Sequence, residues 1–422
     1  MDRMDPEGNE YNPETLALGY GYDPLLSEGS VKPPVFLTST FQFKSAMEGK
    51  RFFELAYGLR QKEEGESLGL IYSRINNPNM QIFEERMAAW DHMEQGAVFS
   101  SGMAAIMTAI LCHVQPGDYI LSSAPVYGGT HYLFEHILPK FNVRVIQVPA
   151  GNDTAALMDE AAQEIGVEKV KMIYLETPAN PSNIMIDLES ISSLAKDFSS
   201  RRKEKVLLAV DNTFFGPIFQ RPADYGADLI IYSATKFIGG HSDLIAGVVT
   251  GKKEDIKPIL DYRTIFGTMA NPFTGWLLLR SLETLSVRMR RQAKSAKILA
   301  KYLMEHSKVK NVKYPALYSS DNPQKKIFEK QCTGPGSLIS FDIYQGEEQA
   351  FKLLDSFRIF RLAVSLGGTE SLVEHPMSMT HADVPPEQLE NFGVTSGTIR
   401  MSVGIEHISD LKRDIKNALA KI

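Results

Sequence analysis

The chain has 422 residues, of which 43% are hydrophobic and 23% are charged, and its formal net charge at pH 7 is -6. This length suggests two or three domains, or one large domain with an extension, and the composition is that of an ordinary soluble globular protein. The acidic balance gives no electrostatic reason to expect nucleic acid or an anionic membrane as a partner.

The two cysteines, Cys112 and Cys332, lie far apart in the sequence and have no metal-ligand spacing around them. Two cysteines do not make a disulfide framework, so we expect a reducing, cytoplasmic location and no metal site. The acidic, polar N-terminus has no apolar core of a signal peptide. No run of about 18 apolar residues occurs, so we expect no membrane association.

Residues 1–75 show no regular alternation of strands and helices. An arm of this length rarely forms its own core, so we expect it to lie across another domain or a neighbouring subunit. Near its end, Tyr72 and Arg74 would point the same way on extended backbone and could clamp an anion, although a surface pair is the alternative. Asn77 then starts a predicted helix that extends to Trp90.

From about residue 97 short apolar strands alternate with helices, a pattern typical of an open parallel sheet. The strand 97–99 is followed by Ser101, Gly102 and Met103, which open an apolar helix. A strand, a Ser/Gly turn and a helix N-terminus leave free backbone N–H groups that would suit a single phosphate. The turn is neither a Walker A loop nor a GxGxxG motif.

Two further residues follow apolar strands. Tyr127 comes after the strand 119–121 and could either stack on a flat cofactor ring or pack in a tight turn. Asp211 directly follows the strand 206–210, where a buried carboxylate needs a partner such as a pyridinium N–H. A turn former or helix cap is the alternative role for Asp211. The other elements predicted in this half are strands at 143–148, 172–175 and 246–250 and helices at 103–112, 154–166 and 188–201.

The apolar strand 229–232 leads through Ser233 and Thr235 to Lys236 and two glycines. Ligands of open parallel sheets bind beyond the carboxyl ends of the strands, so this lysine is placed to react. A desolvated lysine loses its charge easily and forms Schiff bases with carbonyls, including the aldehyde of pyridoxal phosphate. A lysine that merely reaches solvent is the alternative. We expect Asp211 and Lys236 to meet at the same edge of the sheet.

After a long predicted helix at 272–306 the pattern changes to that of a smaller α+β domain. The segment 338–343 alternates like a half-buried strand, and a further strand at 398–403 contains Arg400. An arginine there needs a carboxylate, which either the protein or an amino-acid substrate could supply. The other elements predicted here are helices at 347–357 and 409–421. We therefore predict an arm at 1–75, an α/β cofactor domain at 76–280 and an α+β domain at 281–422.

Taken together, these segments resemble the Cys/Met-metabolism (trans-sulfuration) family of pyridoxal-phosphate enzymes of fold type I. The likeness runs from about Val31 to the C-terminus, and Ser233-Ala-Thr-Lys236-Phe-Ile-Gly-Gly-His241 is similar to the family's lysine signature. The other similar segments, in chain order, are Tyr72-Ser-Arg74, Asn77-Pro78, Ser101-Gly102-Met103, Tyr127-Gly-Gly-Thr130, Glu176-Thr-Pro-Ala-Asn180-Pro181, Asp211-Asn-Thr213 and Ser365-Leu-Gly-Gly368. The resemblance implies an α/β, aspartate aminotransferase-like large domain with a mixed, mostly parallel sheet, plus a smaller C-terminal α+β domain.

The resemblance also implies roles. Lys236 and Tyr127 would be catalytic: Lys236 would hold the cofactor covalently and move protons, and Tyr127 would stack on the ring whose nitrogen Asp211 holds. The other cofactor contacts would come from Ser101, Gly102, Met103, Asn180, Thr213, Ser233 and Thr235, and from Tyr72 and Arg74 of a neighbouring subunit. Substrate would bind to Asn180, Ser365 and Arg400. The family usually forms a homotetramer, a dimer of dimers.

For the reaction, the resemblance implies chemistry at the γ carbon of a sulfur-containing or O-acylated amino acid. We predict α,γ-elimination on methionine- or homocysteine-type substrates, giving 2-oxobutanoate, ammonia and a thiol. The alternatives are γ-replacement on O-acylhomoserine, as in cystathionine γ-synthase or an O-acylhomoserine sulfhydrylase, and cystathionine cleavage. A dinucleotide-binding oxidoreductase is a rival from another class, but the chain lacks GxGxxG. A protein of this fold serving only in binding or assembly is a third.

Three departures from the family bear on this choice. Residues 52–68 look like an insertion near the site entrance. Gly129 stands where methionine γ-lyases typically carry a cysteine, which weakens the methionine γ-lyase prediction. Val364 stands where cystathionine-handling lyases often carry a glutamate, which weakens the cystathionine γ-lyase alternative.

Overall fold

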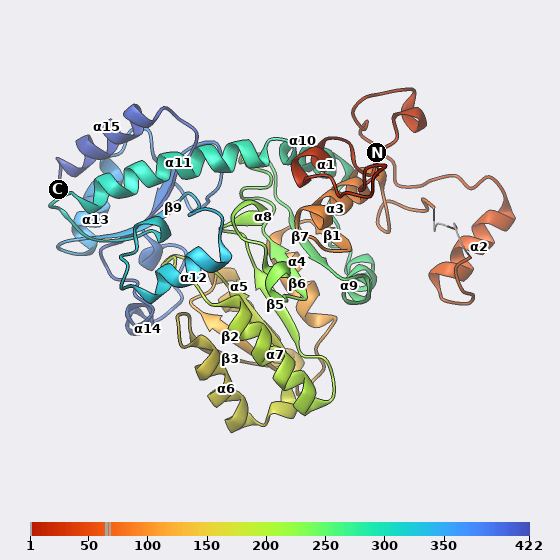
Figure 1. Cartoon of the computed structure of the whole chain (residues 1–422), viewed down its shortest axis with the longest axis horizontal. Helices are drawn as coiled ribbons and strands as arrows, with labels where there is room; N and C mark the ends of the chain where they lie inside the picture. Colours follow the sequence, from red (N-terminus) through yellow and green to blue (C-terminus); the bar gives the residue numbers. More distant parts are fainter. Residues whose placement is uncertain (1, 64–65, 67–68) are drawn as a thin grey trace.

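The computed structural model describes residues 2–63, 66 and 69–422, and these residues form two sheets. The strands of the larger sheet are β1 (Gln95–Phe99), β2 (Tyr119–Ala124), β3 (Arg144–Pro149), β4 (Val170–Glu176), β5 (Leu207–Asp211), β6 (Leu229–Tyr232) and β7 (Gly247–Gly251). Those of the smaller sheet are β8 (Val309–Lys313), β9 (Leu338–Ile343), β10 (Arg361–Leu362), β11 (Leu372–Glu374) and β12 (Thr398–Ser402). Figure 1 shows the larger sheet in the middle of an elongated molecule and the smaller one towards the C-terminus.

The larger sheet is mixed and mostly parallel, as predicted. Its order is β1-β7-β6-β5-β4-β2-β3, and only β7 runs antiparallel to its neighbours β6 and β1. Asp211 lies beside Glu176 of β4 on one side and beside Ile231 of β6 on the other. The carboxyl ends of β2, β4, β5 and β6 therefore form one edge. The segment after Asp211 and the segment that leads from Ile231 to Lys236 therefore start side by side at this edge, as the sequence predicts.

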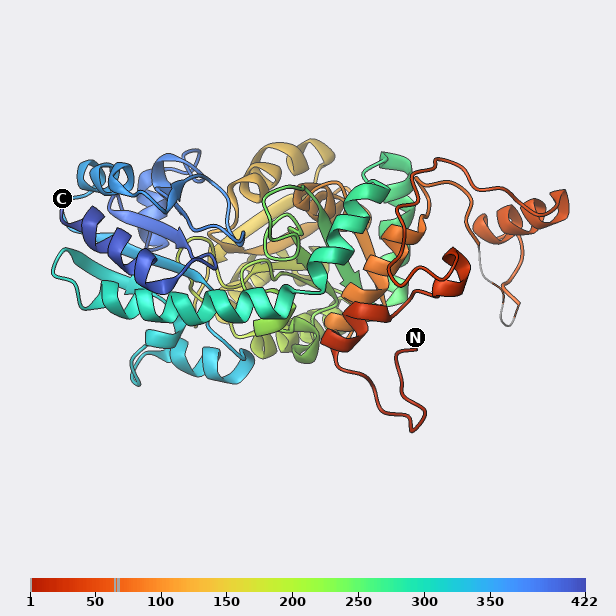
Figure 2. The same cartoon turned by 90° about the horizontal axis from the view of Figure 1, so that it is seen from above.

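Helices cover both faces of this sheet, so its central strands β5 and β6 are buried at every position rather than at alternate ones. One face packs against α3 (Pro78–Trp90), α7 (Leu188–Arg202) and α10 (Pro272–Leu282), and the other against α4 (Gly102–Leu111) and α9 (Lys253–Phe266). Figure 2 shows these layers from above. The other helices are α1 (Pro13–Gly19), α2 (Ala46–Ala56), α5 (Gly128–Tyr132), α6 (Thr154–Ile165), α8 (Gly216–Phe219), α11 (Leu285–Met304), α12 (Pro323–Gln331), α13 (Glu347–Ser356), α14 (Pro386–Asn391) and α15 (Ile408–Leu419).

Two secondary-structure predictions need correction. The helix expected over 272–306 is interrupted at Thr284, whose hydroxyl donates to the carbonyl of Ser281, so that α10 and α11 are separate helices. The strand β9 was expected to be half-buried, but all six of its residues are buried. Its polar side can be buried because Asp342 has partners there, including Lys313 at 3.2 Å.

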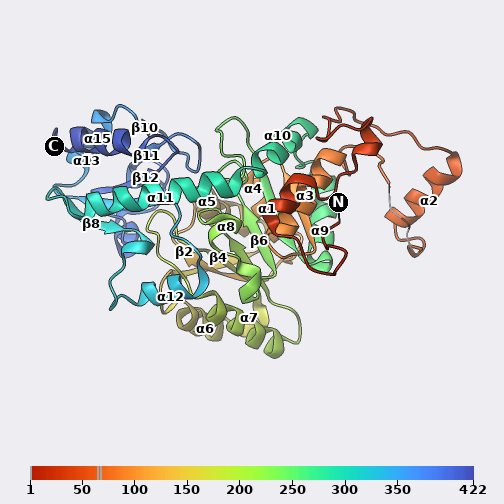
Figure 3. The ribbon, with the colours of Figure 1, turned by 45° about the horizontal axis from the view of Figure 1, so that its top comes forward.

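Helix α11 joins the two cores. Leu285 and Met289 near its start belong to the core of the larger sheet, whereas Leu299 and Leu303 near its end belong to the core of the smaller one. Figure 3 shows the helix running from α10 towards α13 and α15. The predicted domain division at residues 75 and 280 is not tested by these contacts and stays a prediction.

The N-terminal arm packs only partly on the rest of the chain. Helix α2 lies apart from both sheets in Figures 1 and 2, and Gly49 is the only one of its described residues that is buried. Phe43 packs instead on Phe52, with their ring centroids 5.6 Å apart. Of the predicted insertion at 52–68, residues 64, 65, 67 and 68 lie outside the described residues. Among the residues that are described, no helix is long and apolar enough to cross a bilayer.

Candidate active site

Lys236 lies in the turn that follows β6, where its half-buried amine donates a hydrogen bond to Ser365 Oγ over 3.1 Å. Burial, followed by the charge of Arg400, lowers the pKa of Lys236 to about 8, although the charge of Glu374 opposes this shift. An amine with this pKa is neutral far more often near neutral pH than an ordinary lysine. Such an amine can act as a nucleophile, which is the role that the sequence predicts for Lys236.

Arg400 on β12 is buried and makes three polar contacts. Its Nη1 atom lies 3.0 Å from Glu374 Oε1 on the neighbouring strand β11 and donates to Asn180 Oδ1 at 3.0 Å. Its Nη2 atom donates to the carbonyl of Ser365 at 3.1 Å. The protein thus supplies one carboxylate partner for Arg400, as the first of the two alternatives predicts. The guanidinium has further N–H donors on Nε and Nη2, so it can also bind a substrate carboxylate.

Glu374 belongs to a buried polar group that the sequence did not reveal. Its Oε1 atom accepts from Thr380 Oγ1 at 3.0 Å, and the same hydroxyl lies 3.0 Å from His381 Nδ1. Burial and the charge of Arg400 lower the pKa of His381 to about 4, so its ring is neutral. The one available signal was the position of Glu374, an acid that directly ends an apolar pair of strand residues.

Asp211 is a buried carboxylate that has room for another donor. Its Oδ1 atom accepts from the Thr213 N–H at 3.0 Å, and the Tyr174 hydroxyl approaches Oδ2 at 3.5 Å. A carboxylate can accept about four hydrogen bonds. Among the described residues it has no cationic partner, and burial raises its pKa. A cation bound next to Asp211 would therefore be strongly stabilised.

Glu176 lies next to Asp211 and positions the loop of Tyr127. Its Oε2 atom accepts a hydrogen bond of 2.7 Å from the Tyr127 N–H. Burial, followed by the charge of Asp211, raises the pKa of Glu176 well above its usual value. Tyr127 as a whole residue is 42% exposed. A Cβ atom at Gly129 would lie 2.7 Å from the Tyr127 ring and 3.0 Å from Met103 Sδ, so Gly129 leaves room for both side chains.

The predicted phosphate site lies at the N-terminus of α4. A Cβ atom at Gly102 would lie 3.0 to 3.1 Å from Ser233, so the absence of a side chain lets the start of α4 lie this close to Ser233. The Ser233 N–H donates to Thr213 Oγ1 at 2.9 Å, and the Ser233 hydroxyl has no partner among the described residues. Together with the N–H groups of the first helical turn, this hydroxyl forms a set of donors that suits a phosphate.

Two other predicted phosphate ligands already have partners. The Ser101 hydroxyl caps α4 by accepting from the Ala104 N–H at 3.0 Å. The Thr235 hydroxyl donates to the Ala246 carbonyl at 3.1 Å and accepts a hydrogen bond from the Ala246 N–H at 3.0 Å. Both side chains therefore fix the backbone around the site, and their direct contacts to a cofactor stay predictions.

Tyr72 and Arg74 make no contact with the group around Lys236 among the described residues. The extended backbone expected there is wrong, because the Tyr72 carbonyl accepts from the Ile75 N–H and closes a turn. The guanidinium nevertheless lies 5.6 Å from the centroid of the tyrosine ring and donates to the Thr264 carbonyl on α9. The pair is thus preassembled on a surface, with Tyr72 40% exposed.

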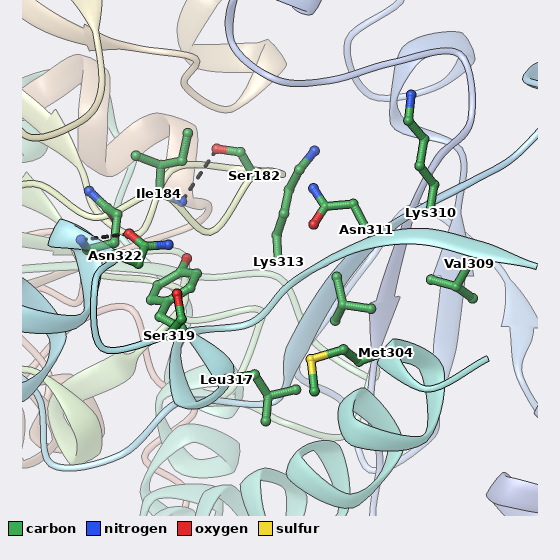
Figure 4. Close-up of a pocket in the computed structure, with 13 residues that line it drawn as sticks. Ser182, Ile184, Met304, Val309, Lys310, Asn311, Lys313, Leu317, Ser319 and Asn322 are labelled. Atoms are coloured by element: carbon green, nitrogen blue, oxygen red, sulfur yellow. Dashed lines mark hydrogen bonds between the residues drawn. The ribbon is translucent and has the colours of Figure 1, made fainter. Parts of the chain in front are cut away.

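A separate hollow of about 480 Å³ opens near the loop that carries Asn180. Ser182 and Ile184 approach it from that loop, and Lys313 and Asn311 approach it from β8, as Figure 4 shows. None of the predicted cofactor or substrate residues lines it, so we distinguish it from the candidate active site.

Comparison with known proteins identifies the cofactor. Residues 14–420 match the family described as Cys/Met metabolism PLP-dependent enzyme. The chain belongs to this family. An L-methionine gamma-lyase of Pseudomonas deceptionensis is 36% identical over 418 residues, which cover 99% of each chain. A cystathionine beta-lyase of Coxiella burnetii is 37% identical over 409 residues, or 96% of this chain and 97% of the relative.

A solved structure agrees with this membership. Cystathionine gamma synthase from Xanthomonas oryzae pv. oryzae, crystallised in complex with aminoacrylate and cysteine, is 32% identical, with a TM-score of 0.86 and coverage of 98% of this chain and 99% of that one. The predicted fold class and family are therefore confirmed. This member of the Cys/Met metabolism family is a PLP-dependent enzyme of sulfur amino-acid metabolism rather than a dinucleotide-binding oxidoreductase.

The residues at the sheet edge fit pyridoxal phosphate. The N–H groups at the start of α4, with the Ser233 hydroxyl close to Gly102, suit the phosphate, and Lys236 offers an amine to the aldehyde. Asp211 has no cationic partner in the described part of the chain, and a protonated ring nitrogen would supply one. Tyr127 offers an exposed aromatic face. These chemical groups match those of the cofactor one by one.

Proposed function

We propose that this enzyme is a carbon–sulfur lyase that carries out α,γ-elimination on methionine- or homocysteine-type amino acids, in the cytoplasm. The products would be 2-oxobutanoate, ammonia and a thiol. The observation that carries the proposal is the contact of the Lys236 amine with Ser365, whose carbonyl is bound by Arg400. This arrangement brings a proton-accepting amine next to a cation suited to an α-carboxylate. The named methionine lyase that matches along 99% of its length supports the choice of substrate.

In this proposal each residue of the chain has a separate task. Arg400 and Asn180 hold the substrate carboxylate, and Ser365 orients the amine of Lys236. Lys236 takes the proton from the α carbon and carries protons to and from the neighbouring carbons. Pyridoxal phosphate supplies an electron sink when it is bound, and the carboxylate of Asp211 keeps its ring nitrogen protonated.

A substrate panel tests the proposal. Purified enzyme would be incubated with L-methionine, L-homocysteine, L-cystathionine and O-acetyl- or O-succinylhomoserine, each with and without a thiol, and 2-oxobutanoate would be assayed. We expect 2-oxobutanoate from methionine or homocysteine alone. Product that appears only from an O-acylhomoserine and a thiol would assign the enzyme to γ-replacement and overturn the proposal.

The second candidate, γ-replacement, is favoured by Gly129. A side chain at this position would collide with the Tyr127 ring and with Met103 as they now lie. The cysteine that methionine γ-lyases typically carry there would therefore require Tyr127 to move. The solved cystathionine gamma synthase shares the fold over almost the whole chain, which keeps this alternative open.

Replacing Gly129 with alanine should weaken cofactor binding and lower kcat, each by roughly tenfold, because the added Cβ displaces the Tyr127 ring from its present position. Equilibrium titration of the cofactor-free enzyme with pyridoxal phosphate, together with steady-state kinetics, measures both effects. Gly151→Ala is the matched control, since nothing lies within 4 Å of a Cβ there. Unchanged binding in Gly129→Ala would show that the ring need not occupy this position.

We propose that the enzyme is a homotetramer, a dimer of dimers, in which the arm of one subunit completes the site of another. Support comes from apolar arm residues that are between 71% and 85% exposed in the single chain: Leu25, Leu26, Val31, Leu37, Tyr57 and Leu59. Surfaces of this kind mark protein–protein contacts. Tyr72 and Arg74 would then reach the phosphate of the neighbouring subunit's cofactor.

A mixing experiment tests this sharing of sites. Arg74→Ala and Lys236→Ala enzymes should each be inactive or nearly so, and co-assembled subunits should regain activity, because a hybrid contains one site with both native residues. Arg144→Ala is the matched control, since Arg144 also lies over a tyrosine ring, 5.9 Å from the centroid of Tyr119. If the hybrids stay inactive although mass measurement shows that they form, the shared site is wrong.

A further inference from the structure

Arg288 on α11 is a buried cation whose partners are mainly backbone carbonyls. Its Nη1 atom donates to the Phe237 carbonyl at 2.8 Å, and Nη2 donates to the carbonyls of Ser281 at 2.9 Å and Ile238 at 3.4 Å. Its Nε atom donates to Thr284 Oγ1 at 3.1 Å. No described carboxylate forms an ion pair with it, and burial lowers its pKa to about 10.

The location of these carbonyls gives the guanidinium a function. A buried, unpaired charge is costly, so Arg288 needs these hydrogen bonds as much as the turn does. Phe237 and Ile238 directly follow Lys236, and the Gly240 N–H donates to the Lys236 carbonyl at 2.7 Å. Gly240 has a φ of +68°, and a Cβ there would overlap the guanidinium. Arg288 therefore packs directly against the turn that carries the lysine.

Gln292 lies one helical turn further along α11 and holds a second loop. Its Nε2 atom donates to the Gly368 carbonyl at 2.6 Å, three residues after Ser365. The two loops also touch, since a Cβ at Gly367 would lie only 2.8 Å from the Phe237 nitrogen. One face of α11 thus binds both the loop of the catalytic lysine and the loop of the substrate serine.

We propose that Arg288 and Gln292 are positioning residues that set the separation of the Lys236 amine from the Ser365 hydroxyl. Arg288 orients the lysine turn, and Gln292 places the substrate loop against it. Helix α11 suits this task because its two halves are anchored in the two cores. The inference rests on the proposed roles of Lys236 and Ser365 and adds two residues, remote from the reacting atoms, that act through them.

Capture of pyridoxal phosphate by the cofactor-free enzyme tests the role of Arg288. The linkage formed with Lys236 would be reduced with borohydride at successive times. The amount of cofactor that is then covalently bound to the protein would be measured. Arg288→Lys keeps the charge but cannot reach three carbonyls with one ammonium group. We expect its capture rate at pH 8 to fall by about tenfold or more, because small misplacements of a reacting group are costly. Arg291→Lys, on an exposed position of the same helix, should capture at the wild-type rate.

The pH profile distinguishes positioning from general damage to the fold. Capture requires the neutral amine, so the wild-type rate should rise with pH around the pKa of Lys236, which is about 8. A lysine turn released towards solvent should move that midpoint upward, towards the ordinary value for lysine. A wild-type rate and midpoint in Arg288→Lys would overturn the role of Arg288.

Gln292→Leu provides the second test and remains informative if Arg288→Lys does not fold. It removes the donor to Gly368, so we expect the KM for the amino-acid substrate to rise about tenfold while capture by Lys236 stays within twofold. Equal KM values in Gln292→Leu and wild type would overturn its role. Lys236→Ala separates these outcomes from the proposed function. Covalent capture in that variant would contradict the assigned lysine itself.

Discussion

Replacing Lys236 with alanine should lower kcat by at least about 10⁴-fold, because the change removes both the covalent nucleophile and the proton carrier. The variant should also lose all borohydride-trapped cofactor. Steady-state assays of 2-oxobutanoate and mass measurement of the reduced protein check the two losses separately. Lys257→Ala, at an exposed position on α9, should retain wild-type values of both.

The same substitution should leave the fold intact. The amine makes one hydrogen bond, to Ser365, so little native structure depends on it. Burial holds the pKa of Lys236 in the folded, cofactor-free chain at about 8, below the ordinary lysine value of 10.5. The unfolded chain therefore binds more protons between these values, and the protonated lysine destabilises the fold below about pH 8. This penalty disappears as the pH rises towards the pKa of the lysine in the unfolded chain. The Lys236→Ala variant should have no such penalty. Denaturant unfolding at pH 7 and pH 10 measures the difference, and full activity in the variant would refute the assignment.

The sheet edge could be predicted because each key residue follows an apolar strand. Parallel strands place their carboxyl ends together, so strand order alone brings Asp211 next to the segment that leads to Lys236. The same rule placed Tyr127 on this edge. Periodicity was sufficient here because the central strands β5 and β6 are buried on both faces and each contains an apolar run.

The partners of the buried charges could not be predicted. Glu374 meets Arg400, and Arg288 meets the turn after Lys236, only through contacts between elements that lie far apart in the sequence. An apolar pattern shows which face of an element is buried, but it does not show what lies opposite a polar residue on that face. For the same reason the burial of Asp342 on β9 was missed, since its partners come from other strands.

Replacing Arg400 with methionine should cause two separate losses. Glu374 would be left as a buried carboxylate without its cation, which should lower the free energy of unfolding by about 3–5 kcal/mol. The substrate carboxylate would lose its guanidinium as well. We expect kcat/KM to fall by at least about 10²-fold, as for the loss of a charge-assisted pair. Denaturant unfolding and steady-state kinetics measure the two effects on the same protein.

The double variant Arg400→Met with Glu374→Gln decides between the two roles of the arginine. It no longer has an unpaired buried charge, so it should recover most of the stability lost in Arg400→Met. If Arg400 binds substrate, kcat/KM stays low, because neutralising Glu374 restores no donor to the substrate carboxylate. If Arg400 serves only to pair with Glu374, the double variant regains activity together with stability. The sequence leaves both roles open, and the free donors on Nε and Nη2 lead us to expect the first outcome.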